Sequence, residues 1–438
     1  MALVRLALVL GSLIAITSVA SAQPSPPPPP AATAPDGLAR TFERAPRSSH
    51  IRGEFIVRAF GRGVGWLIRT IEGPIRSLVY LEARWRVFSR VREVFVNDAH
   101  TLGIYPTVTF QSAFGVTLGA KAFLEHVLGD DKMVLSAERG GSVREAFQYK
   151  YELSTPSLYL RARARYEDNT NQLFAGIGNK QPAVNTRFSQ TRFLGLLATG
   201  AQLGKHLQLG GSAIFNDRDF GPAGDTSTDP SIETAYDTAT VNGFDDGIRT
   251  AEVTGNVELD TRDKPGLTNR GVVVRGFAGT VRQRDRDRNG HYGAEVISYF
   301  TAFWPTRVFV TRVALEGVID RNDDIPFTEL PRLGGTGMLR GYSSGQFRDK
   351  LATSVTLEYR YPIHANLAGS LFVEGGKVAR TYEALAGFDA WHLGYGGGWI
   401  LNTSRAIKFR LDLAYGDGLN VYFSTDVIDA FRNREGEL

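Results

Sequence analysis

Apolar and polar residues alternate strictly along many stretches of the chain beyond residue 104. In Leu158 to Glu167 (LYLRARARYE), every second residue is apolar or aromatic, and the residues between them include Arg161, Arg163 and Arg165. A period of two predicts β-strands with one apolar and one polar face. The runs are about 10 residues long, which fits a tilted strand that crosses a membrane better than the shorter strand of a soluble sandwich.

The alternation predicts an all-β fold with about sixteen antiparallel strands. These expected strands lie near residues 104–114, 115–127, 131–140, 144–154, 157–167, 187–202, 205–217, 247–260, 270–281, 291–305, 307–320, 350–361, 367–375, 391–401, 405–415 and 418–428.

The connections between the expected strands are sorted by length. Long connections follow odd-numbered strands, whereas the others are short except for 261–269; the long ones are 168–186, 218–246, 282–290, 321–349 and 376–390. Outer-membrane barrels have tight periplasmic turns and long external loops, whereas in a soluble sandwich nothing requires long connections to follow odd-numbered strands. The sequence therefore predicts a transmembrane β-barrel over residues 104–431 of an outer-membrane protein, with a charged tail at 432–438.

Three segments are expected before the barrel. Residues 1–22 have an early charge at Arg5, an apolar run and the ending Ala20-Ser21-Ala22, which indicates a cleaved signal peptide. Residues 23–54 form a proline-rich linker. Residues 55–103 form a short amphipathic periplasmic segment, whose apolar spacings of three and four favour a helix, although part of it also alternates like a strand.

Composition removes several other classes of function. The chain contains no cysteine, so disulfides and a lipoprotein anchor are excluded. The net charge of +4 comes without a basic block, so no nucleic-acid partner is expected. The seven histidines show no metal-ligand spacing, and we expect no metal and no cofactor.

A possible nucleophile motif occurs at Gly341-Tyr342-Ser343-Ser344-Gly345, which fits G-x-S-x-G. In esterases this serine sits on a turn between a buried strand and a helix. Here a glycine-rich stretch precedes Ser343 and an expected strand follows it. A serine esterase that uses Ser343 is therefore a remote alternative, and we expect that the protein is not an enzyme.

Four motifs, in order, give a resemblance to a known family. They are the D-x-R-D…G turn with Asp260, Arg262, Asp263 and Gly271, the R-G-Y of Arg340, Gly341 and Tyr342, the E-x-R-x-P of Glu358, Arg360 and Pro362, and an F-x-E-x-G with Phe372, Glu374 and Gly376. In this order the chain resembles the BamA/TamA-type outer-membrane barrels of the bacterial surface antigen superfamily. The resemblance implies a barrel in which Arg340 ties the long external loop at 321–349 inside the lumen.

The alternation along two neighbouring strands places carboxylates in the lumen that can bind the guanidinium of this loop. If Leu357 and Val373 face lipid, the carboxylates of Glu358 and Glu374 face the lumen from neighbouring strands, where they repel each other unless a cation lies between them. Arg340 is that cation if the loop folds inward. The alternative is that Arg340 is exposed and the glutamates pair with Arg360.

The resemblance also sets expectations about function. Barrels of this type normally carry POTRA domains that take up unfolded client proteins, but the residues before 104 leave no room for one, so partner lipoproteins are not expected. The leading hypothesis is a barrel that assists insertion or translocation of proteins at the outer membrane, with outer-membrane lipids and unfolded clients as partners. The alternative is a pore or transporter for small solutes or lipids, in which Arg161, Arg163 and Arg165 select anions.

Overall fold

The computed structural model describes the chain from residue 97 to residue 424, except for short gaps. These gaps are at residues 98, 100, 112–114, 128, 141–143, 181–183, 226, 228, 265–267, 285–287, 302–305, 321, 323, 365–366 and 403–406. The expected signal peptide, linker and charged tail lie outside the described residues, as does nearly all of the amphipathic segment.

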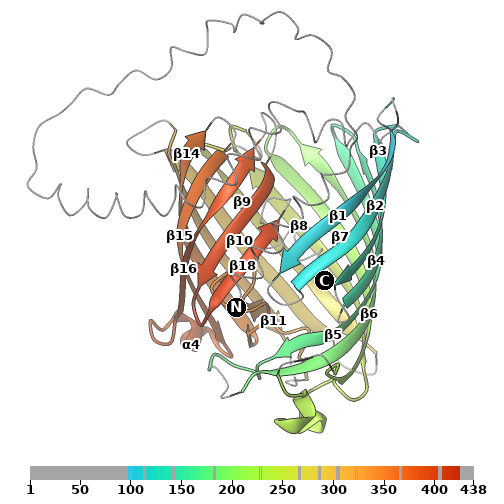
Figure 1. The fold of residues 1–438 in the computed structure, drawn as a ribbon, viewed down its shortest axis with the longest axis vertical. Helices are drawn as coiled ribbons and strands as arrows, with labels where there is room; N and C mark the ends of the chain where they lie inside the picture. Colours follow the sequence, from blue (N-terminus) through green and yellow to red (C-terminus); the bar gives the residue numbers. More distant parts are fainter. Residues whose placement is uncertain are drawn as a thin grey trace, which may run out of the picture. The chain divides into compact units, whose positions relative to one another are not determined.

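Sixteen strands form one antiparallel sheet that closes into a barrel (Figure 1). In chain order they are β1 (Leu102–Gln111), β2 (Gly115–Glu125), β3 (Asp131–Gly140), β4 (Arg144–Ser154), β5 (Leu158–Phe174), β6 (Thr186–Leu203), β7 (Leu207–Pro222), β8 (Ile248–Asp260), β9 (Gly271–Gln283), β10 (Arg288–Thr301), β11 (Val308–Ile319), β14 (Leu351–His364), β15 (Leu367–Ala379), β16 (His392–Asn402), β17 (Ile407–Tyr415) and β18 (Leu419–Ser424). Neighbours in the barrel are neighbours in the chain, apart from β11 and β14, and β1 and β18.

The remaining elements lie in the long connections, which share one end of the barrel, drawn at the bottom of Figure 1. We call it the long-loop end. They are the paired strands β12 (Arg332–Leu333) and β13 (Phe347–Arg348), the 3-10 helices η1 (Ile232–Thr234) and η2 (Thr238–Thr240), and the helix α4 (Tyr382–Ala386). None of the helices in the described part of the chain is long and apolar enough to cross a membrane.

The outer face of the barrel is apolar and the inner face is polar, as the alternation predicts. On β14 and β15 the outward residues Leu357 and Val373 are 49% and 57% exposed, whereas the intervening Glu358 and Glu374 are buried. An apolar outer band and a polar interior are the pattern of a membrane barrel. The prediction of an antiparallel barrel of about sixteen strands is therefore confirmed.

The strand ends differ from the predicted ones at four of the long connections, including the one after β15, which continues to Ala379 and not only to 375. β5 continues to Phe174 and β7 to Pro222, well beyond the predicted ends at 167 and 217, and β9 and β10 leave only residues 284–287 between them. β5 continues past the alternating region through a bulge between Asn169 and Gln172. Its last residues are held there by packing, because Phe174 joins a buried aromatic cluster with Phe188, Phe244 and Phe327.

The connection between β5 and β6 reaches across the long-loop end to β15 and β16. The side chain of Asn179 accepts a hydrogen bond from the backbone of Val378 at 2.9 Å and donates one to the carbonyl of Ala390 at 2.6 Å. Its carbonyl oxygen lies 2.8 Å from Nε2 of His392. The first and second halves of the barrel wall are therefore joined at this end by contacts outside the sheet.

Candidate functional site: a loop inside the barrel and the seam between the first and last strands

The connection between β11 and β14, residues 320–350, packs against the inner wall. Leu333, Leu339 and Phe347 of this connection form a buried cluster with Ala314 of β11 and Val378 of β15, among others. β12 and β13 pair at its base through Arg332 with Arg348 and Leu333 with Phe347. An apolar core therefore holds this connection, which we call the inner loop, within the lumen.

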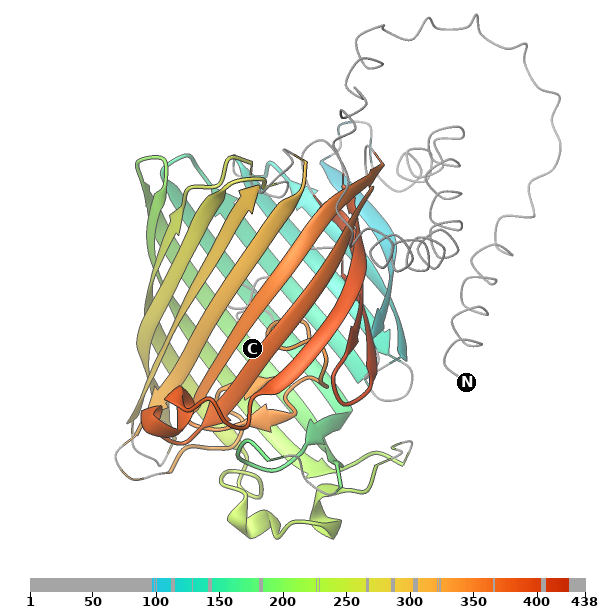
Figure 2. The ribbon, with the colours of Figure 1, turned by 90° about the vertical axis from the view of Figure 1, so that its left-hand side faces the viewer.

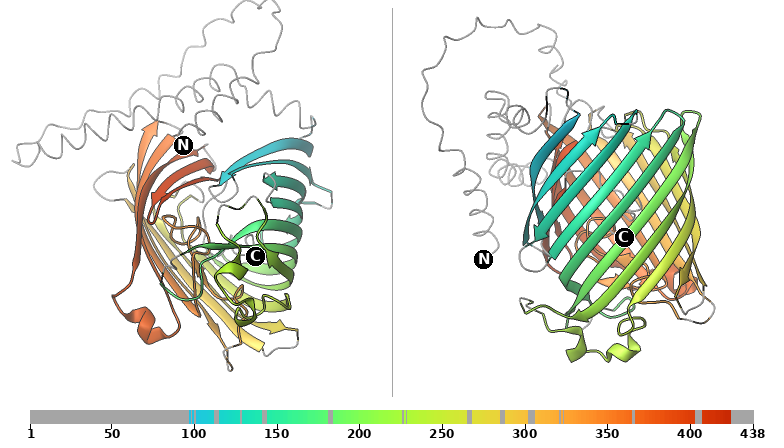
Figure 3. Two further views of the ribbon diagram at one scale, coloured as in Figure 1. Left: turned by 60° about the horizontal axis from the view of Figure 1, so that its bottom comes forward. Right: turned by 90° about the vertical axis from the view of Figure 1, so that its right-hand side faces the viewer.

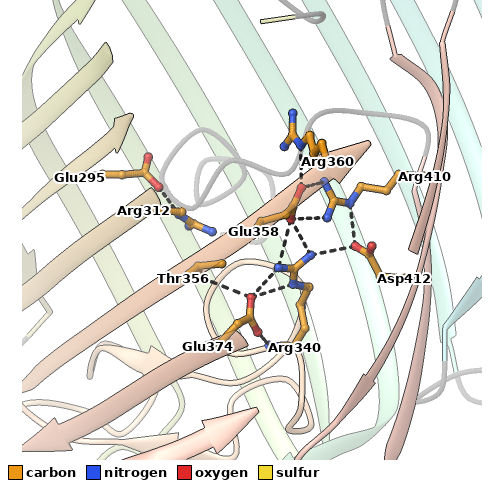
Figure 4. Close-up of polar contacts among 9 residues, drawn as sticks. All are labelled: Glu295, Arg312, Arg340, Thr356, Glu358, Arg360, Glu374, Arg410 and Asp412. Carbon is orange, nitrogen blue, oxygen red and sulfur yellow. Dashed lines mark hydrogen bonds and ion pairs between the residues drawn. The ribbon is translucent and has the colours of Figure 1, made fainter. Parts of the chain in front are cut away.

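Arg340 lies at the inner end of this loop, between carboxylates from three strands (Figure 4). Its Nε and one terminal nitrogen are both 2.7 Å from Oε1 of Glu374. The other terminal nitrogen lies 3.1 Å from Asp412 and 3.4 Å from Glu358. The backbone N–H of Arg340 also donates to Glu374 at 2.6 Å, so both the side chain and the main chain of the loop are bound.

Charges in this cluster balance. Arg410 donates to Asp412 and to both oxygens of Glu358, and Arg360 donates to Glu358 at 2.6 Å. Three guanidinium groups thus face three carboxylates, which offsets the cost of burying each charge. Burial lowers the pKa of Arg340, but the carboxylates of Glu374, Asp412 and Glu358 outweigh it and raise the pKa above its ordinary value. Arg340 therefore stays charged at any physiological pH.

An aromatic ring supports the same guanidinium. The guanidinium carbon Cζ of Arg340 lies 3.5 Å from the ring centroid of Phe372. Phe372 faces inward from β15 and pairs in the sheet with Glu358 of β14. A cation over an aromatic face is attracted by the ring electrons, more so where water is excluded. Phe372 therefore binds the charge and covers one face of it.

Gly341 brings the loop backbone against β16 and β17. A Cβ atom at this position would lie 2.8 Å from the carbonyl oxygen of Tyr415 and 3.0 Å from Cα of Gly394. Real Cβ atoms are rarely that close to backbone, so a side chain here would force the loop away. The carbonyl of Gly341 accepts a hydrogen bond from Asn420 of β18 at 3.0 Å.

Tyr342 connects the loop to the last strand. Its carbonyl oxygen accepts a hydrogen bond from the hydroxyl of Tyr422 at 3.1 Å, and its own hydroxyl donates to the carbonyl of Leu393 at 3.2 Å. Burial raises the pKa of the Tyr342 hydroxyl, and the charge of Asp417 raises it further. The Arg-Gly-Tyr stretch therefore contacts five strands, β14 to β18, through three consecutive residues.

Four of the other residues of the expected loop-docking motif lie in the charged cluster around Arg340, and two lie elsewhere. Glu358, Arg360, Phe372 and Glu374 surround it, whereas Gly376 lies under the loop, where an added Cβ would be 3.1 Å from Leu333. Pro362 is not part of the cluster. It lies near the end of β14, where the register with β15 shifts between Pro362 and His364.

Sequence reasoning missed the contribution of the last strands. Arg410 and Asp412 on β17 supply a third cation and a third carboxylate, and Asn420 and Tyr422 on β18 bind the loop backbone. The alternation placed Arg410 and Asp412 on the polar face of their strand. What it could not show is that the loop reaches this wall.

The expected periplasmic turn between β8 and β9 is held by two aspartates. Asp260 forms a two-pronged ion pair with Arg262, in which Nε donates to Oδ1 at 2.9 Å and a terminal nitrogen donates to Oδ2 at 2.6 Å. Asp263 accepts from the backbone N–H groups of Lys264, Asn269 and Arg270. Gly271 has φ +126, and a Cβ there would lie 2.6 Å from Cα of Arg262. Only glycine adopts that conformation without strain. These motif residues therefore shape a turn.

Two further sets of residues were candidates for function: Ser343 and the three lumenal arginines. Ser343 lies in the inner loop between the two-residue strands β12 and β13, not on a turn from a strand into a helix, and its backbone N–H is bound by Gln346. Of the three lumenal arginines, Arg161 pairs with Glu152 and Arg165 pairs with Glu167. Within the described residues no cluster of His, Asp and Glu has the makings of a metal site.

The seam between β1 and β18 has fewer residue pairs than any other junction of the barrel among the residues that the structure describes. One residue pair, Gln111 with Tyr422, connects the two strands in the described part of the chain, whereas β1 and β2 share ten pairs and β17 and β18 share six. Figure 3 shows the two strands diverging from this point. Among the described residues no other pair joins β18 to β1, and a strand whose N–H and C=O groups are unpaired along one side is an edge strand.

Residues 116–424 match the Omp85 superfamily domain. The chain belongs to the Omp85 superfamily. This confirms the family that the four sequence motifs indicated and places the chain among outer-membrane β-barrels. None of the curated proteins matches the chain in sequence.

Two solved structures show the same Omp85-type fold. BamA from Haemophilus ducreyi lacking POTRA domains 1-3 superposes with a TM-score of 0.55 at 13% identity, over 74% of this chain and 70% of that one. CdiB from Escherichia coli superposes with a TM-score of 0.50 at 10% identity, over 73% of this chain and 62% of that one. At such low identity the likeness concerns the fold alone.

Proposed function

We propose that this Omp85 barrel assists insertion or translocation of proteins at the outer membrane, and that client strands pair with the open edge of β1. The observation that carries the proposal is the seam, where a single pair joins β1 to β18 among the described residues. An edge strand with free N–H and C=O groups adds a further strand by β-augmentation. Unfolded barrel proteins are chains that supply such strands.

The inner loop has a defined part in this proposal. Asn420 and Tyr422 bind β18 to the loop, and Arg340 binds the loop to β14, β15 and β17. The last strand therefore keeps its position when its pairing with β1 is lost. The opening then falls on the β1 side of the seam, where a client can enter the sheet.

A disulfide lock across the seam tests the proposal. The chain has no cysteine, so Gln111→Cys with Tyr422→Cys creates a single possible crosslink at the one seam pair. The matched control is Leu413→Cys with Val421→Cys, which joins β17 to β18 and leaves the seam free. Each variant is introduced into cells that lack the native gene.

The readout is the quantity of other barrel and surface proteins in the outer membrane, with transcripts measured in parallel. We expect deletion to lower these proteins at constant transcript, the control to restore them, and the seam lock to restore them only after reduction. If deletion removes nothing except this protein, the proposal fails and a pore for solutes or lipids takes its place. If the oxidised seam lock restores all clients, insertion does not use this seam.

A further inference from the structure

The connection between β15 and β16, residues 380–391, does not project away from the barrel. α4 starts after Thr381, whose side chain accepts a hydrogen bond from the backbone of Ala384 at 3.3 Å. Figure 2 shows the helix against the outside of the wall at the long-loop end, below β15 and β16. We call this connection the outer flap.

The flap covers residues that would otherwise face lipid. Along β15, Val373 is 57% exposed, but Lys377 and Ala379 on the same face are only 4% and 5% exposed. Leu385 of α4 packs on Ala379 and on Leu351 of β14, with Tyr292 and Leu315 beside them. All of these wall residues are at outward positions of their strands, so the flap lies on the membrane side of the barrel.

The flap also neutralises a cation on this outer face. Nζ of Lys377 donates to the carbonyl of Gly387 at 3.2 Å and lies 3.5 Å from a carboxylate oxygen of Asp389. Trp391 donates to the same carbonyl at 3.2 Å and places its ring against Gly375. The lysine is therefore enclosed by the flap and not presented to lipid.

The outer surface of the flap is aromatic. Phe388 is 97% exposed and Tyr382 is 57% exposed, and Leu393 and Tyr395 of β16 continue this apolar surface on the outward face of the barrel. The charged groups beside it, Lys377 and Arg380 against Glu383 and Asp389, balance. An apolar patch without net charge, continuous with the lipid-facing wall, fits lipid better than a charged protein partner.

We propose that the outer flap is a lipid anchor in which Phe388 and Tyr382 insert into the outer leaflet at the boundary between acyl chains and headgroups. Aromatic side chains are enriched at that depth in membrane barrels because their apolar rings and polar edges suit it. The flap starts seven residues after Val373, about 23 Å along the strand. This separation carries it from the lipid-facing band towards the membrane surface.

Site-directed spin labelling tests the depth of the flap. Because the chain has no cysteine, Phe388→Cys accepts one nitroxide at the most exposed flap residue. Val373→Cys on the lipid-facing wall and Glu233→Cys on the exposed η1 segment are matched controls for lipid and for water. Purified full-length protein is reconstituted in phospholipid vesicles, and heat-modifiable gel mobility verifies that each variant is folded.

Collision of the nitroxide with oxygen, which concentrates in lipid, is compared with collision with a water-soluble nickel chelate. We expect the label at 388 to favour oxygen, as at 373, with a depth nearer the membrane surface. A ratio equal to that at 233 would show that the flap projects into water and would overturn the proposal. Protection from both probes would show protein contact, such as a second copy of the barrel, and would overturn it as well.

Discussion

The carbonyl oxygen of Tyr342 accepts a hydrogen bond from Tyr422, the residue that forms the one described pair between the last and first strands. The inner loop and the seam therefore meet at a single side chain. Any displacement of the loop changes the support of β18 at the point where the barrel closes. This contact makes the state of the loop and the state of the seam depend on each other.

Removal of the Tyr422 hydroxyl tests this dependence. Tyr422→Phe keeps the ring but removes this donor; the carbonyl of Tyr342 keeps the hydrogen bond from the backbone N–H of Gly335 at 2.9 Å, so the loss is about 0.5–1.5 kcal/mol. We expect a lower urea midpoint of unfolding in detergent and faster labelling of a cysteine placed in β1. Tyr395→Phe, on the lipid-facing surface, is the control and should leave both unchanged. Equal behaviour of the two variants would contradict the coupling.

A side chain at Gly341 should displace the loop. Gly341→Ala places a methyl group 2.8 Å from the carbonyl oxygen of Tyr415, and overpacking of this kind costs about 1–3 kcal/mol. The measurement is limited proteolysis of the inner loop in folded protein, where we expect faster cleavage. Gly337→Ala in the same loop is the control, because no atom lies within 4 Å of the added Cβ. The argument fails if both alanine variants resist the protease as the parent does.

Replacing Arg340 should unbalance the buried charges. Arg340→Met removes one cation from a cluster of three and breaks the ion pair of Glu374, whereas Asp412 keeps its pair with Arg410; breaking a buried pair costs about 3–5 kcal/mol. We expect a large fall in the free energy of unfolding, measured by urea titration. Arg249→Met, which breaks an exposed pair with Asp217, should have little effect. Similar losses in both variants would show that burial of the cluster contributes nothing.

The turn between β8 and β9 should weaken in acid. Burial raises the pKa of Asp263, but hydrogen bonds from three backbone N–H groups lower it overall, below the value of about 3.9 for an unfolded chain. A lowered pKa means that the charge stabilises the fold above that unfolded value and that the gain is lost as pH falls through the folded pKa. Asp263→Asn should therefore melt at a lower temperature than the parent at pH 7, and the difference should vanish in strong acid. A difference that persists there would have another cause.

Much of the barrel could be predicted from the sequence because lipid and lumen impose opposite demands on successive residues. The outward Leu357 and Val373 and the inward Glu358 and Glu374 follow from parity alone. The ends of β5 and β7 could not be predicted in this way. Beyond the membrane the alternation stops, and Phe174 is held by aromatic residues from other connections.

The same limit applies to the residues around Arg340. Glu358 and Glu374 lie on adjacent strands, so local pairing rules bring them together. Arg410 and Asp412 reach the cluster only because the inner loop extends to β17, which depends on the packing of Leu333 and Leu339 far from either residue. The outer flap is a similar case, since nothing in residues 380–391 alone shows that Leu385 packs on the outside of the wall.

The contacts of Asn179 have a mechanical consequence. A closed sheet with one weakly paired junction is expected to open by separation of the two strands at that junction, along their full length. Here Asn179 connects the segment between β5 and β6 to β15, to β16 and to the connection between them at the long-loop end. These hydrogen bonds oppose separation of the two parts of the wall at this rim. If the seam opens as proposed, we therefore expect it to open first at the opposite rim, the one with the short turns.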